Sequence, residues 1–478
     1  MPYEPIIGME VHIELTTASK MFCACRADAF GAAPNTHVCP VCLGMPGTLP
    51  VINEQAVRYT VMTGLALHAT IQPEAVFARK NYFYPDLPKG YQISQYELPL
   101  CRDGYLDIEV GEQTRRVRIR RVHLEEDTGK LTHTDGYSLI DFNRAGVPLM
   151  EIVSEADLRS AAEAFAYVTR LRQLVRYLGV SSGDMEKGAM RCEVNLSLRP
   201  SGTQLLGTKV EIKNLNSFRS VRNAIAYEIE RQTQLLLNHQ PITQVTMGWD
   251  ESAGVTRQQR SKEEAHDYRY FPEPDLPPLT LTDEYVAGIA ASLPELPEIK
   301  RDRFIAEYGL SRYDANVLVE DQAVADYFEQ AVNAGRPAVN PKLIANWVTG
   351  ELFRQMKETN LPIGEVKIKP DDLVALIAMV SAGTITQSAA KQAFGVMWQT
   401  GRPPRHIVEE MGLEQISSAD QLAEVVTAVI SNNPDAVASV KAGKESTLRF
   451  LIGQVMRATG GKANPQLAER LLRERICR

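Results

Sequence analysis

Four cysteines in one short segment have the spacing of metal ligands. Residues 21–42, MFCACRADAFGAAPNTHVCPVC, contain a C-x-C-x13-C-x2-C pattern whose members are Cys23, Cys25, Cys39 and Cys42. Two closely spaced cysteine pairs can converge on one tetrahedral zinc ion, and four thiolates leave no coordination position open for a substrate. We therefore predict a structural zinc clip at residues 23–42. Buried small side chains and a redox-active C-x-x-C pair are the alternative interpretations.

A segment near the N-terminus carries a second set of candidate ligands. In MEVHIEL, residues 9–15, apolar residues alternate strictly with Glu10, His12 and Glu14, which is typical of a β-strand with one polar face. Residues i and i+2 of a strand lie roughly 6.6 Å apart on the same side, so two such side chains can bind one cation. For this strand alone, a solvated polar face is the competing interpretation.

Three later segments repeat this alternation of polar and apolar residues. Their polar faces carry His123, Glu125 and Asp127 in the first, Arg191, Glu193, Asn195 and Ser197 in the second, and Lys209, Glu211 and Lys213 in the third. If the four strands share one antiparallel sheet, its apolar face packs on helices and its polar face gathers carboxylates, imidazoles and cations. Such a face suits the chemistry of a magnesium nucleotide, because Mg²⁺ prefers carboxylate, phosphate and water oxygens.

Two further stretches, residues 79–100 and 141–153, combine polar and aromatic residues with prolines and glycines. Each is a candidate for a substrate or nucleotide contact, or else a structured surface loop. Their candidate contact residues are Lys80, Tyr82, Asn143 and Arg144. The sequence contains no G-x-x-x-x-G-K-[ST] loop and no kinase-like glycine loop, so any nucleotide must be held by the polar sheet.

Length and composition are those of an ordinary globular protein with several domains. The chain has 478 residues, of which 44% are hydrophobic and 23% charged, and its length predicts about two to four domains. No segment approaches the roughly 18 apolar residues of a membrane span, so we expect no membrane partner. The N-terminal stretch lacks a basic region followed by an apolar run, from which we expect a cytoplasmic protein with reduced thiols. The scattered Cys101, Cys192 and Cys477 are interpreted as ordinary thiols.

The order of these patterns predicts an α+β fold. Strand alternation ends at the proline-rich segment FPEPDLPP, residues 271–278, and helical spacing follows,. A second break occurs near QTGRPPRHI, residues 399–407. We therefore predict an N-terminal domain with an antiparallel sheet at residues 1–293 and two all-α domains at residues 294–405 and 406–478.

Charge is distributed unevenly along the chain. The whole sequence has 52 basic and 59 acidic residues and a net charge of −7, which argues against a general nucleic-acid binder. From Lys441 to Arg478, however, nine Lys/Arg oppose three Glu, a local charge of +6. We predict that this segment is either a mobile arm that binds phosphates or a helix with a solvated face. Its candidate phosphate-binding residues are Lys462, Arg470, Arg473 and Arg475.

Seven long blocks of the sequence carry a family resemblance. They are IIGMEVHIEL, CAC…CPVCLGMPGTLPVIN, RKNYFYPDLPKGYQISQY, HLEEDTGKL, DFNRAGVPLMEIV, VEIKNLNSF and RSKEEAHDYRYFPEPDLPP. In this order they resemble the B subunits of the bacterial and organellar glutamyl-tRNA(Gln)/aspartyl-tRNA(Asn) amidotransferases. The resemblance covers the whole chain. It implies a carbon–nitrogen ligase (EC 6.3.5.-) with a glutamine-synthetase-like catalytic cradle, a helical domain and a tRNA-binding helical tail domain.

The resemblance also implies partners and ligands. An amidase-type A subunit would release ammonia from glutamine into an internal channel, and a small C subunit would complete a heterotrimer. This chain would use ATP to phosphorylate glutamate or aspartate on misacylated tRNA(Gln) or tRNA(Asn), and ammonia would attack the acyl phosphate. Zinc would be structural, as in zinc-bearing relatives.

The family pattern assigns roles to individual residues of the polar faces and loops. The Mg²⁺ ligands would be Glu10, His12, Glu125 and Glu211, with Glu193 on a similar face as the alternative to Glu211. The catalytic residues would be Glu10, His12 and Glu125. The nucleotide- or substrate-binding residues would be Lys80, Tyr82, Asn143, Arg144, Glu193, Lys213 and Arg269. The tRNA-binding residues would be the four basic residues of the tail.

Two other classes of function match parts of these patterns. One is a noncatalytic, zinc-stabilised RNA-binding module, which should be basic overall. The other is a scaffold that only positions an amidase, which needs no polar sheet. The sequence also lacks a G-x-S-x-G elbow and an amidase-type Ser/Lys/Gly-rich signature, so we expect a partner to release the ammonia.

Overall fold

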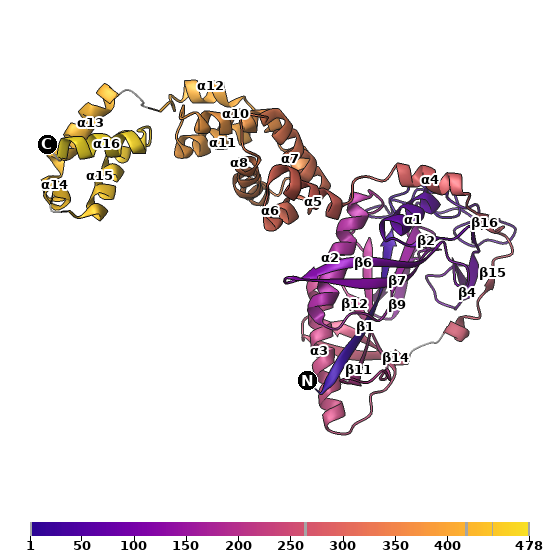
Figure 1. Cartoon of the computed structure of the whole chain (residues 1–478). Coiled ribbons are helices and arrows are strands. Elements are labelled where there is room, and N and C mark those ends of the chain that lie inside the picture. Colours follow the sequence, from indigo (N-terminus) through magenta and orange to yellow (C-terminus); the bar gives the residue numbers. More distant parts are fainter. Residues whose placement is uncertain (1, 262–264, 416–418, 442, 477–478) are drawn as a thin grey trace. The chain divides into compact units, whose positions relative to one another are not determined.

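The chain forms two compact units, Met1–Leu296 and Pro297–Arg478 (Figure 1). The computed structural model describes residues 2–261, 265–415, 419–441 and 443–476. The first unit contains a large sheet with helices, and the second is built from helices, so the predicted α+β fold is confirmed. The domain boundaries at residues 293/294 and 405/406 stay predictions.

A nine-stranded sheet forms the centre of the first unit. Its strands lie in the order β14-β13-β12-β11-β1-β10-β7-β6-β2. In that order their bounds are Val255–Ser261, Val245–Asp250, Val210–Leu215, Met190–Pro200, Tyr3–Glu14, Pro148–Ser154, Gln113–Glu126, Cys101–Val110 and Thr70–Ile71. The four segments with alternating polar residues fall in or beside β1, β7, β11 and β12, so the prediction that they share one sheet is confirmed.

One strand pair departs from the antiparallel sheet predicted from the sequence. Strands β12 and β13 are parallel, whereas the other neighbours in this sheet are antiparallel. Parallel neighbours need a long crossover connection, and helix α3 (Phe218–Leu237) lies between these two strands in the chain. Alternation determines the two faces of a strand but not the direction of its neighbour, so the sequence did not reveal this pair.

Three helices cover the apolar face of the sheet. They are α1 (Glu54–Ala66), α2 (Ala161–Tyr177) and α3, and their N-caps are Asn53, Ser160 and Ser217, whose side chains accept a backbone N–H,. Helices and sheet share one hydrophobic core, which includes Val11, Val122, Val194 and Ile212 of the sheet and Val61, Leu171 and Ile225 of the helices. The alternating polar residues therefore gather on the opposite face.

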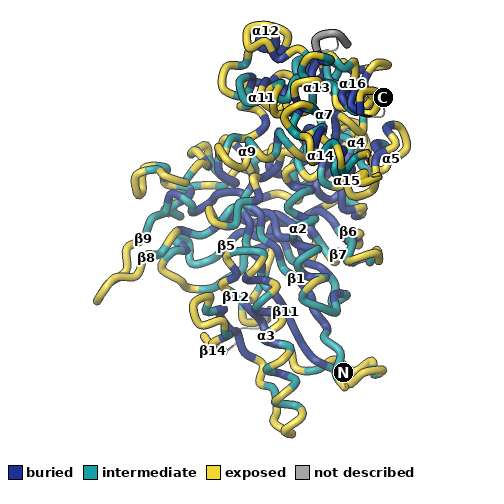
Figure 2. Tube along the Cα trace, turned by 90° about the vertical axis from the view of Figure 1, so that its left-hand side faces the viewer, coloured by how far each residue is buried: buried dark blue, intermediate teal, exposed yellow. Residues whose placement is uncertain are grey.

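Smaller sheets complete the first unit. Strands β15 (Phe271–Pro272), β4 (Ala78–Asn81) and β5 (Tyr91–Ser94) form one sheet, β16 (Leu279–Thr280) pairs with β3 (Glu74–Ala75), and β8 (Lys130–Thr134) pairs with β9 (Tyr137–Asp141). A 3-10 turn (Ala265–Tyr268) precedes β15, and helix α4 (Asp283–Ala291) follows β16. In Figure 2 the β8–β9 hairpin is largely exposed, whereas buried residues follow the strands of the main sheet.

The second unit consists of successive helices around two hydrophobic cores. The first core is formed by α5 (Pro297–Tyr308), α6 (Arg312–Leu318), α7 (Gln322–Gly335), α8 (Pro341–Trp347), a π-helical turn (Val348–Leu352), α9 (Phe353–Thr359), a 3-10 turn (Ile363–Glu365), α10 (Pro370–Ser381), α11 (Gln387–Thr400) and α12 (Pro404–Glu410). The second is formed by α13 (Ala419–Asn432), α14 (Pro434–Lys441), α15 (Glu445–Ala458) and α16 (Pro465–Ile476). Within the described residues of either unit, no helix has the length and apolar character needed to cross a membrane.

Helix α16 belongs to the C-terminal bundle. Its residues Ala468, Leu471, Leu472 and Ile476 are buried in the core that α13 and α15 also line. The prediction of a mobile basic arm is therefore wrong, because the helix that carries the arginines is held by its apolar face. Binding of phosphates by its exposed face stays a prediction.

Candidate functional site

The strand register arranges the polar residues in rows that cross the sheet. On β1, His12 lies opposite Glu151 of β10, and Glu151 lies opposite His123 of β7. In a neighbouring row, Glu10 of β1 lies opposite Glu193 of β11. Directly opposed residues of antiparallel strands have Cβ atoms about 5 Å apart. The rows therefore bring carboxylates from different strands within reach of common cations.

The first cluster, which we call the His12 cluster, consists of His12, Glu125 and Glu151, whose candidate ligand atoms all lie within 4.8 Å of one another. His12 Nε2 is 3.4 Å from Glu125 Oε1, and Ser94 Oγ donates to Glu125 Oε2 at 3.2 Å. His123 Nε2 lies 3.0 Å from Glu151 Oε2. The two glutamates are only 1% and 7% exposed. Buried carboxylates this close together require positive charge nearby, and a divalent cation suits that need.

Charges within the His12 cluster shift the pKa values of its members. Burial lowers the pKa of His12, but the hydrogen bond to Glu125 and the charge of Glu151 outweigh burial and raise it to about 9,. Burial raises the pKa of Glu125, whereas His12 and Lys80 lower it, and the net effect is a lowered pKa. The pKa of Glu151 is lowered well below its usual range against burial, chiefly by His123. Both glutamates are therefore ionised at neutral pH and can act as ligands.

A second cluster on the same face, the Glu10 cluster, contains only carboxylates. Its members are Glu10, Glu193 and Glu211, whose candidate ligand atoms also lie within 4.8 Å of one another. Asn195 Nδ2 donates to Glu10 Oε1 at 2.8 Å, and Thr246 Oγ1 donates to Glu211 Oε2 at 2.7 Å. Lys213 Nζ lies 2.9 Å from Glu193 Oε2. These neutral and cationic donors orient the carboxylates that would bind a cation.

The two clusters divide the magnesium ligands predicted from the sequence. His12 and Glu125 belong to the first cluster, whereas Glu10 and Glu211 belong to the second. Glu151 was not predicted from the sequence, because all seven residues of its strand β10 are buried and the strand therefore has no polar face. A single charged residue within an otherwise apolar strand is the signal that could have identified it.

Lys80, Tyr82 and Arg269 were predicted to contact nucleotide or substrate. Lys80 Nζ lies 5.0 Å from the centre of the Tyr268 ring and 6.0 Å from that of Tyr82. Burial lowers the pKa of Lys80, but the charges of Glu125 and other acidic groups outweigh burial and raise it. The structure therefore brings Lys80 and Tyr82 to the edge of the His12 cluster. Arg269 is exposed in the segment between the 3-10 turn and β15.

Asn143 and Arg144 take part in structural contacts. Asn143 is 1% exposed; its Nδ2 donates to the carbonyl of Ala33 and its Oδ1 accepts the N–H of His37, both at 2.7 Å. Arg144 donates to two backbone carbonyls of residues 128–129 and lies 3.6 Å from Asp127. Asn143 therefore fastens the zinc clip to the loop before β10, and Arg144 supports the end of β7.

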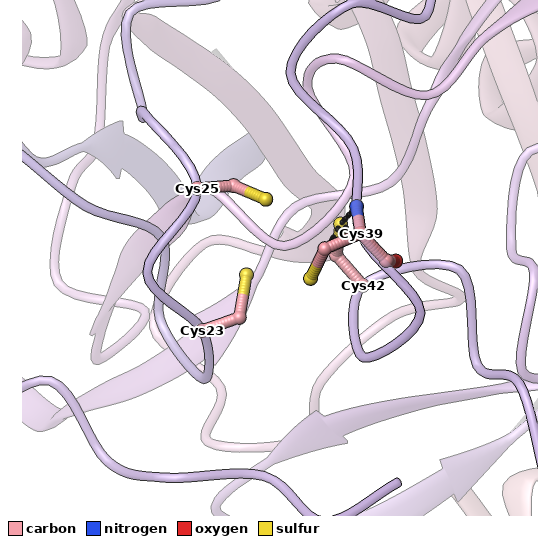
Figure 3. Close-up of side chains that lie close together, drawn as sticks. All are labelled: Cys23, Cys25, Cys39 and Cys42. Atoms are coloured by element: carbon pink, nitrogen blue, oxygen red, sulfur yellow. Dashed lines mark hydrogen bonds between the residues drawn. The ribbon is translucent and has the colours of Figure 1, made fainter.

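The four cysteines of the zinc clip converge from two loop segments (Figure 3). Their sulfur atoms all lie within 4.8 Å of one another, and Cys39 Sγ and Cys42 Sγ are 3.9 Å apart. Zinc–sulfur bonds of about 2.3 Å in a tetrahedron place sulfurs about 3.8 Å apart, so the donor set fits zinc. Cys101 and Cys192 are buried outside this group, and Cys477 lies outside the described residues.

Cys42 is the thiol of the clip that is best prepared to ionise. A hydrogen bond from Cys23 lowers the pKa of Cys42, burial opposes this, and the Cys39 N–H and the Lys20 charge lower it further, to about 4. The Cys39 N–H donates to Cys42 Sγ at 3.2 Å, and the buried Lys20 Nζ lies 3.6 Å from the same sulfur. These donors favour a thiolate, the form that binds metals.

The predicted tRNA-binding residues of the tail differ in their contacts. Arg473 pairs with Glu445 at 2.8 Å and with Glu469 at 3.0 Å. Arg475 donates to the carbonyl of Ala423 and to Thr427. Arg470 lies on the exposed part of α16, and Lys462 precedes the helix. Arg470 Nε lies 3.8 Å from Glu474 Oε1, a longer contact than those of Arg473. Arg470 and Lys462 are therefore better placed to bind a phosphate than Arg473 and Arg475, which are held by closer partners.

The fold and the site define a class of protein: a domain with two carboxylate clusters on the polar face of one sheet and a group of four cysteines that could hold a metal ion, followed by helical bundles. Residues 5–287 match the family model described as the GatB/GatE catalytic domain, and residues 326–476 match the one described as the GatB domain. The chain therefore belongs to the GatB/GatE amidotransferase family, and it is a catalytic component of a ligase of class EC 6.3.5.-.

Curated relatives are similar over their full lengths. The B subunit of the aspartyl/glutamyl-tRNA(Asn/Gln) amidotransferase of Thermodesulfovibrio yellowstonii is 53% identical over 473 residues, which cover 99% of both chains. The corresponding chain of Roseiflexus castenholzii is 53% identical over 482 residues and 100% of both chains. That of Thermomicrobium roseum is 54% identical over 480 residues, 100% of this chain and 99% of the relative. The resemblance found in the sequence blocks is thereby confirmed.

Proposed function

We propose that the chain uses ATP to activate the side-chain carboxylate of glutamate on tRNA(Gln), of aspartate on tRNA(Asn), or of both. A carboxylate oxygen attacks the γ-phosphorus of ATP, and ADP leaves. Ammonia then attacks the acyl carbon, phosphate leaves, and the nitrogen loses a proton to give the amide. Phosphorylation is needed because a carboxylate cannot expel oxide, and most of the catalysis of such a step is positioning and charge neutralisation.

One observation carries this proposal: two carboxylate clusters, with buried or half-buried members, lie side by side on the polar face of one sheet. An RNA-binding module or a scaffold has no use for such clusters, whose burial is unfavourable without cations. The His12 cluster would hold one Mg²⁺ and the Glu10 cluster a second, and bound Mg²⁺ would neutralise phosphate charge and orient the triphosphate. A glutamine-synthetase-like arrangement of the cradle is part of the same proposal.

The surrounding side chains hold the carboxylates in place. Ser94 orients Glu125, Thr246 orients Glu211, and Asn195 orients Glu10, each through one hydrogen bond. Such contacts reduce the reorganisation needed when substrate binds. Lys80 adds a half-buried positive charge beside the His12 cluster, where it can attract a phosphoryl oxygen or the substrate carboxylate.

A partner subunit would supply the ammonia, and misacylated tRNA would bind as the substrate. The relatives are named as B subunits, which supports a complex of several subunits, and we propose an amidase-type A subunit and a small C subunit in a heterotrimer. Ammonia would be channelled from the glutaminase of the A subunit. We further propose a structural role for zinc in the clip, tRNA binding by the C-terminal tail, and a cytoplasmic location.

The test is whether ATP turnover depends on the aminoacyl-tRNA. The purified complex is incubated with γ-labelled ATP, saturating ammonia and tRNA charged with glutamate or aspartate, and both labelled phosphate and amidated tRNA are measured. We expect phosphate release only with misacylated tRNA and in step with amide formation. Release of phosphate that is independent of the charged amino acid, or amidation without ATP, would favour the scaffold function instead.

A further inference from the structure

An irregularity in the register of β7 places two successive arginines on the polar face. Between β10 and β7 the pairing shifts by one residue, which leaves Arg120 without a residue directly opposite. Ile119 and Val122, on either side, both belong to the hydrophobic core. Arg120 and Arg121 must therefore both point away from the core, as happens at a β-bulge. Arg121 consequently shares its face with Glu125.

The other arginines of β7 are paired with carboxylates. The pairs are Arg115–Glu163 and Arg116–Asp107, each at 2.9 Å, and Arg118–Asp157 and Arg120–Glu155, each at 2.8 Å. Within the described part of the chain, no carboxylate lies within ion-pair distance of Arg121. Its Nε is buried and has no hydrogen-bond acceptor there. A buried donor without an acceptor is unfavourable, so this position is suited to an anionic ligand.

The surroundings of Arg121 leave its N–H groups available. Its guanidinium lies over the ring of Tyr96, 5.5 Å from the ring centre, and Tyr96 stacks on Tyr270 with centres 4.3 Å apart and planes at 9°. Stacking uses the flat face of a guanidinium, while its donors point outward in the plane. The aromatic pair therefore holds the side chain in position without neutralising its charge.

The same aromatic pair connects Arg121 with the His12 cluster. Burial, together with the charges of Glu125 and Glu151, raises the pKa of the Tyr270 hydroxyl to about 12, while Lys80 and Arg121 act in the opposite direction. All four charges therefore act on one hydroxyl group. In the register, Glu10 of the other cluster lies opposite Val153, which lies opposite Arg121. Two strand spacings amount to about 10 Å, a distance that an arginine side chain and a row of phosphoryl groups can bridge.

We propose that Arg121 binds phosphoryl oxygens of ATP at the edge of the polar face, opposite the metal-binding carboxylates. This inference rests on the proposed ATP-dependent function and names a further residue for it. The phosphodiesters of the tRNA 3′ end offer the same chemistry. ATP is favoured because Arg121 lies on the face of the two carboxylate clusters, and a polyanion that arrives with Mg²⁺ meets both the carboxylates and the arginine.

The experiment measures binding of two ligands to the full-length chain. The dissociation constants of a nonhydrolysable ATP analogue with Mg²⁺ and of uncharged tRNA(Gln) are determined for the natural chain, Arg121→Gln, Arg121→Lys and Arg118→Gln. Arg118 is the matched control because it lies on the same strand but is paired with Asp157 and exposed. Melting curves of all variants check the fold, and Arg121→Lys keeps the charge if Arg121→Gln is unstable.

We expect Arg121→Gln to weaken binding of the ATP analogue by about tenfold to a hundredfold, the range for a lost hydrogen bond to a charged group. Arg121→Lys should lie between this variant and the natural chain, because lysine keeps the charge but not the two-pronged geometry. Arg118→Gln and the affinity for tRNA should not change. Unchanged binding of the analogue by both Arg121 variants, or a loss confined to tRNA, would overturn the inference. If the natural chain itself does not bind the analogue, the proposed function fails instead.

Discussion

The substitution Glu125→Gln tests the His12 cluster most directly. Glutamine keeps the volume of the side chain and one carbonyl oxygen, so the hydrogen bond from Ser94, 3.2 Å in length, can persist,. The substitution removes a negative charge that lies 3.4 Å from His12 Nε2. A cation bound in this cluster would interact with the same charge. The change is thus one of charge and not of packing.

The expected size follows from the electrostatics of the site. Two unit charges about 4 Å apart interact by about 4 kcal/mol at an effective dielectric constant of about 20. If this interaction is realised in the transition state, its loss slows the reaction about a thousandfold. We therefore expect ATP-dependent amidation of misacylated tRNA, with saturating ammonia, to fall on the order of a thousandfold in kcat.

The assay needs a control for the substitution itself. Glu112→Gln makes the same chemical change at an exposed position in the turn between β6 and β7, and it should leave amidation unchanged. Glutaminase activity of the proposed A subunit and assembly with it should persist in both variants. A normal amidation rate in Glu125→Gln would refute the reasoning, and the carboxylates Glu193 and Glu211 would then be the next pair to examine.

Three further predictions concern the other features of the site. Glu151→Gln should slow amidation at least about a hundredfold while the fold is kept, because Glu151 belongs to the same cluster as Glu125,. Elemental analysis should give about one zinc per chain, and Cys39→Ala should lose the zinc and lower Tm, with amidation retained at permissive temperature. The double variant Lys462→Glu/Arg470→Glu should weaken tRNA binding and reduce its salt dependence, as measured by titration at several salt concentrations.

Each of these predictions has a contrary outcome, and the zinc and tRNA predictions also have a control variant. Cys101→Ala alters a buried thiol outside the clip and should keep the zinc; equal stability of zinc-free and zinc-loaded protein would contradict the structural role. Lys357→Glu reverses an exposed charge on α9 and should leave tRNA binding unchanged. If Lys357→Glu weakened tRNA binding as much as the double variant does, the effect would come from the net charge of the protein and not from a contact at Lys462 or Arg470. A Glu151→Gln variant with full activity would remove Glu151 from the metal site.

Local sequence patterns predicted the faces of the strands but not their neighbours. Alternation alone placed His12 and Glu125 on polar faces, and the structure brings them to 3.4 Å. Their grouping with Glu151, and the separation of Glu10 and Glu211 into a second cluster, depend on the strand order β12-β11-β1-β10-β7. That order is set by long-range packing, which no local pattern contains.

Two other features were hidden for related physical reasons. The shift of register at Arg120 interrupts the period of two within β7, so a strict alternation assigns Arg120 or Arg121 to the wrong face. In the tail, the net positive charge was visible in the sequence, but a basic helix and a basic arm have the same composition. Only the burial of Leu471 and Leu472 distinguishes them.

The contacts around the four cysteines show how the proposed structural zinc would be connected to the carboxylate clusters. Asn143 joins the clip to the loop before β10. In that loop, Gly146 and Val147 exchange backbone hydrogen bonds of 2.8 Å with Asp127, and Asp127 in turn pairs with Arg191 of β11 at 2.8 Å. Loss of the metal would therefore first loosen the loop and the ends of β7 and β10. The His12 cluster lies only a few residues further along both strands, so under the proposed structural role a zinc-bound clip would stabilise the geometry of the carboxylates without contacting the substrate.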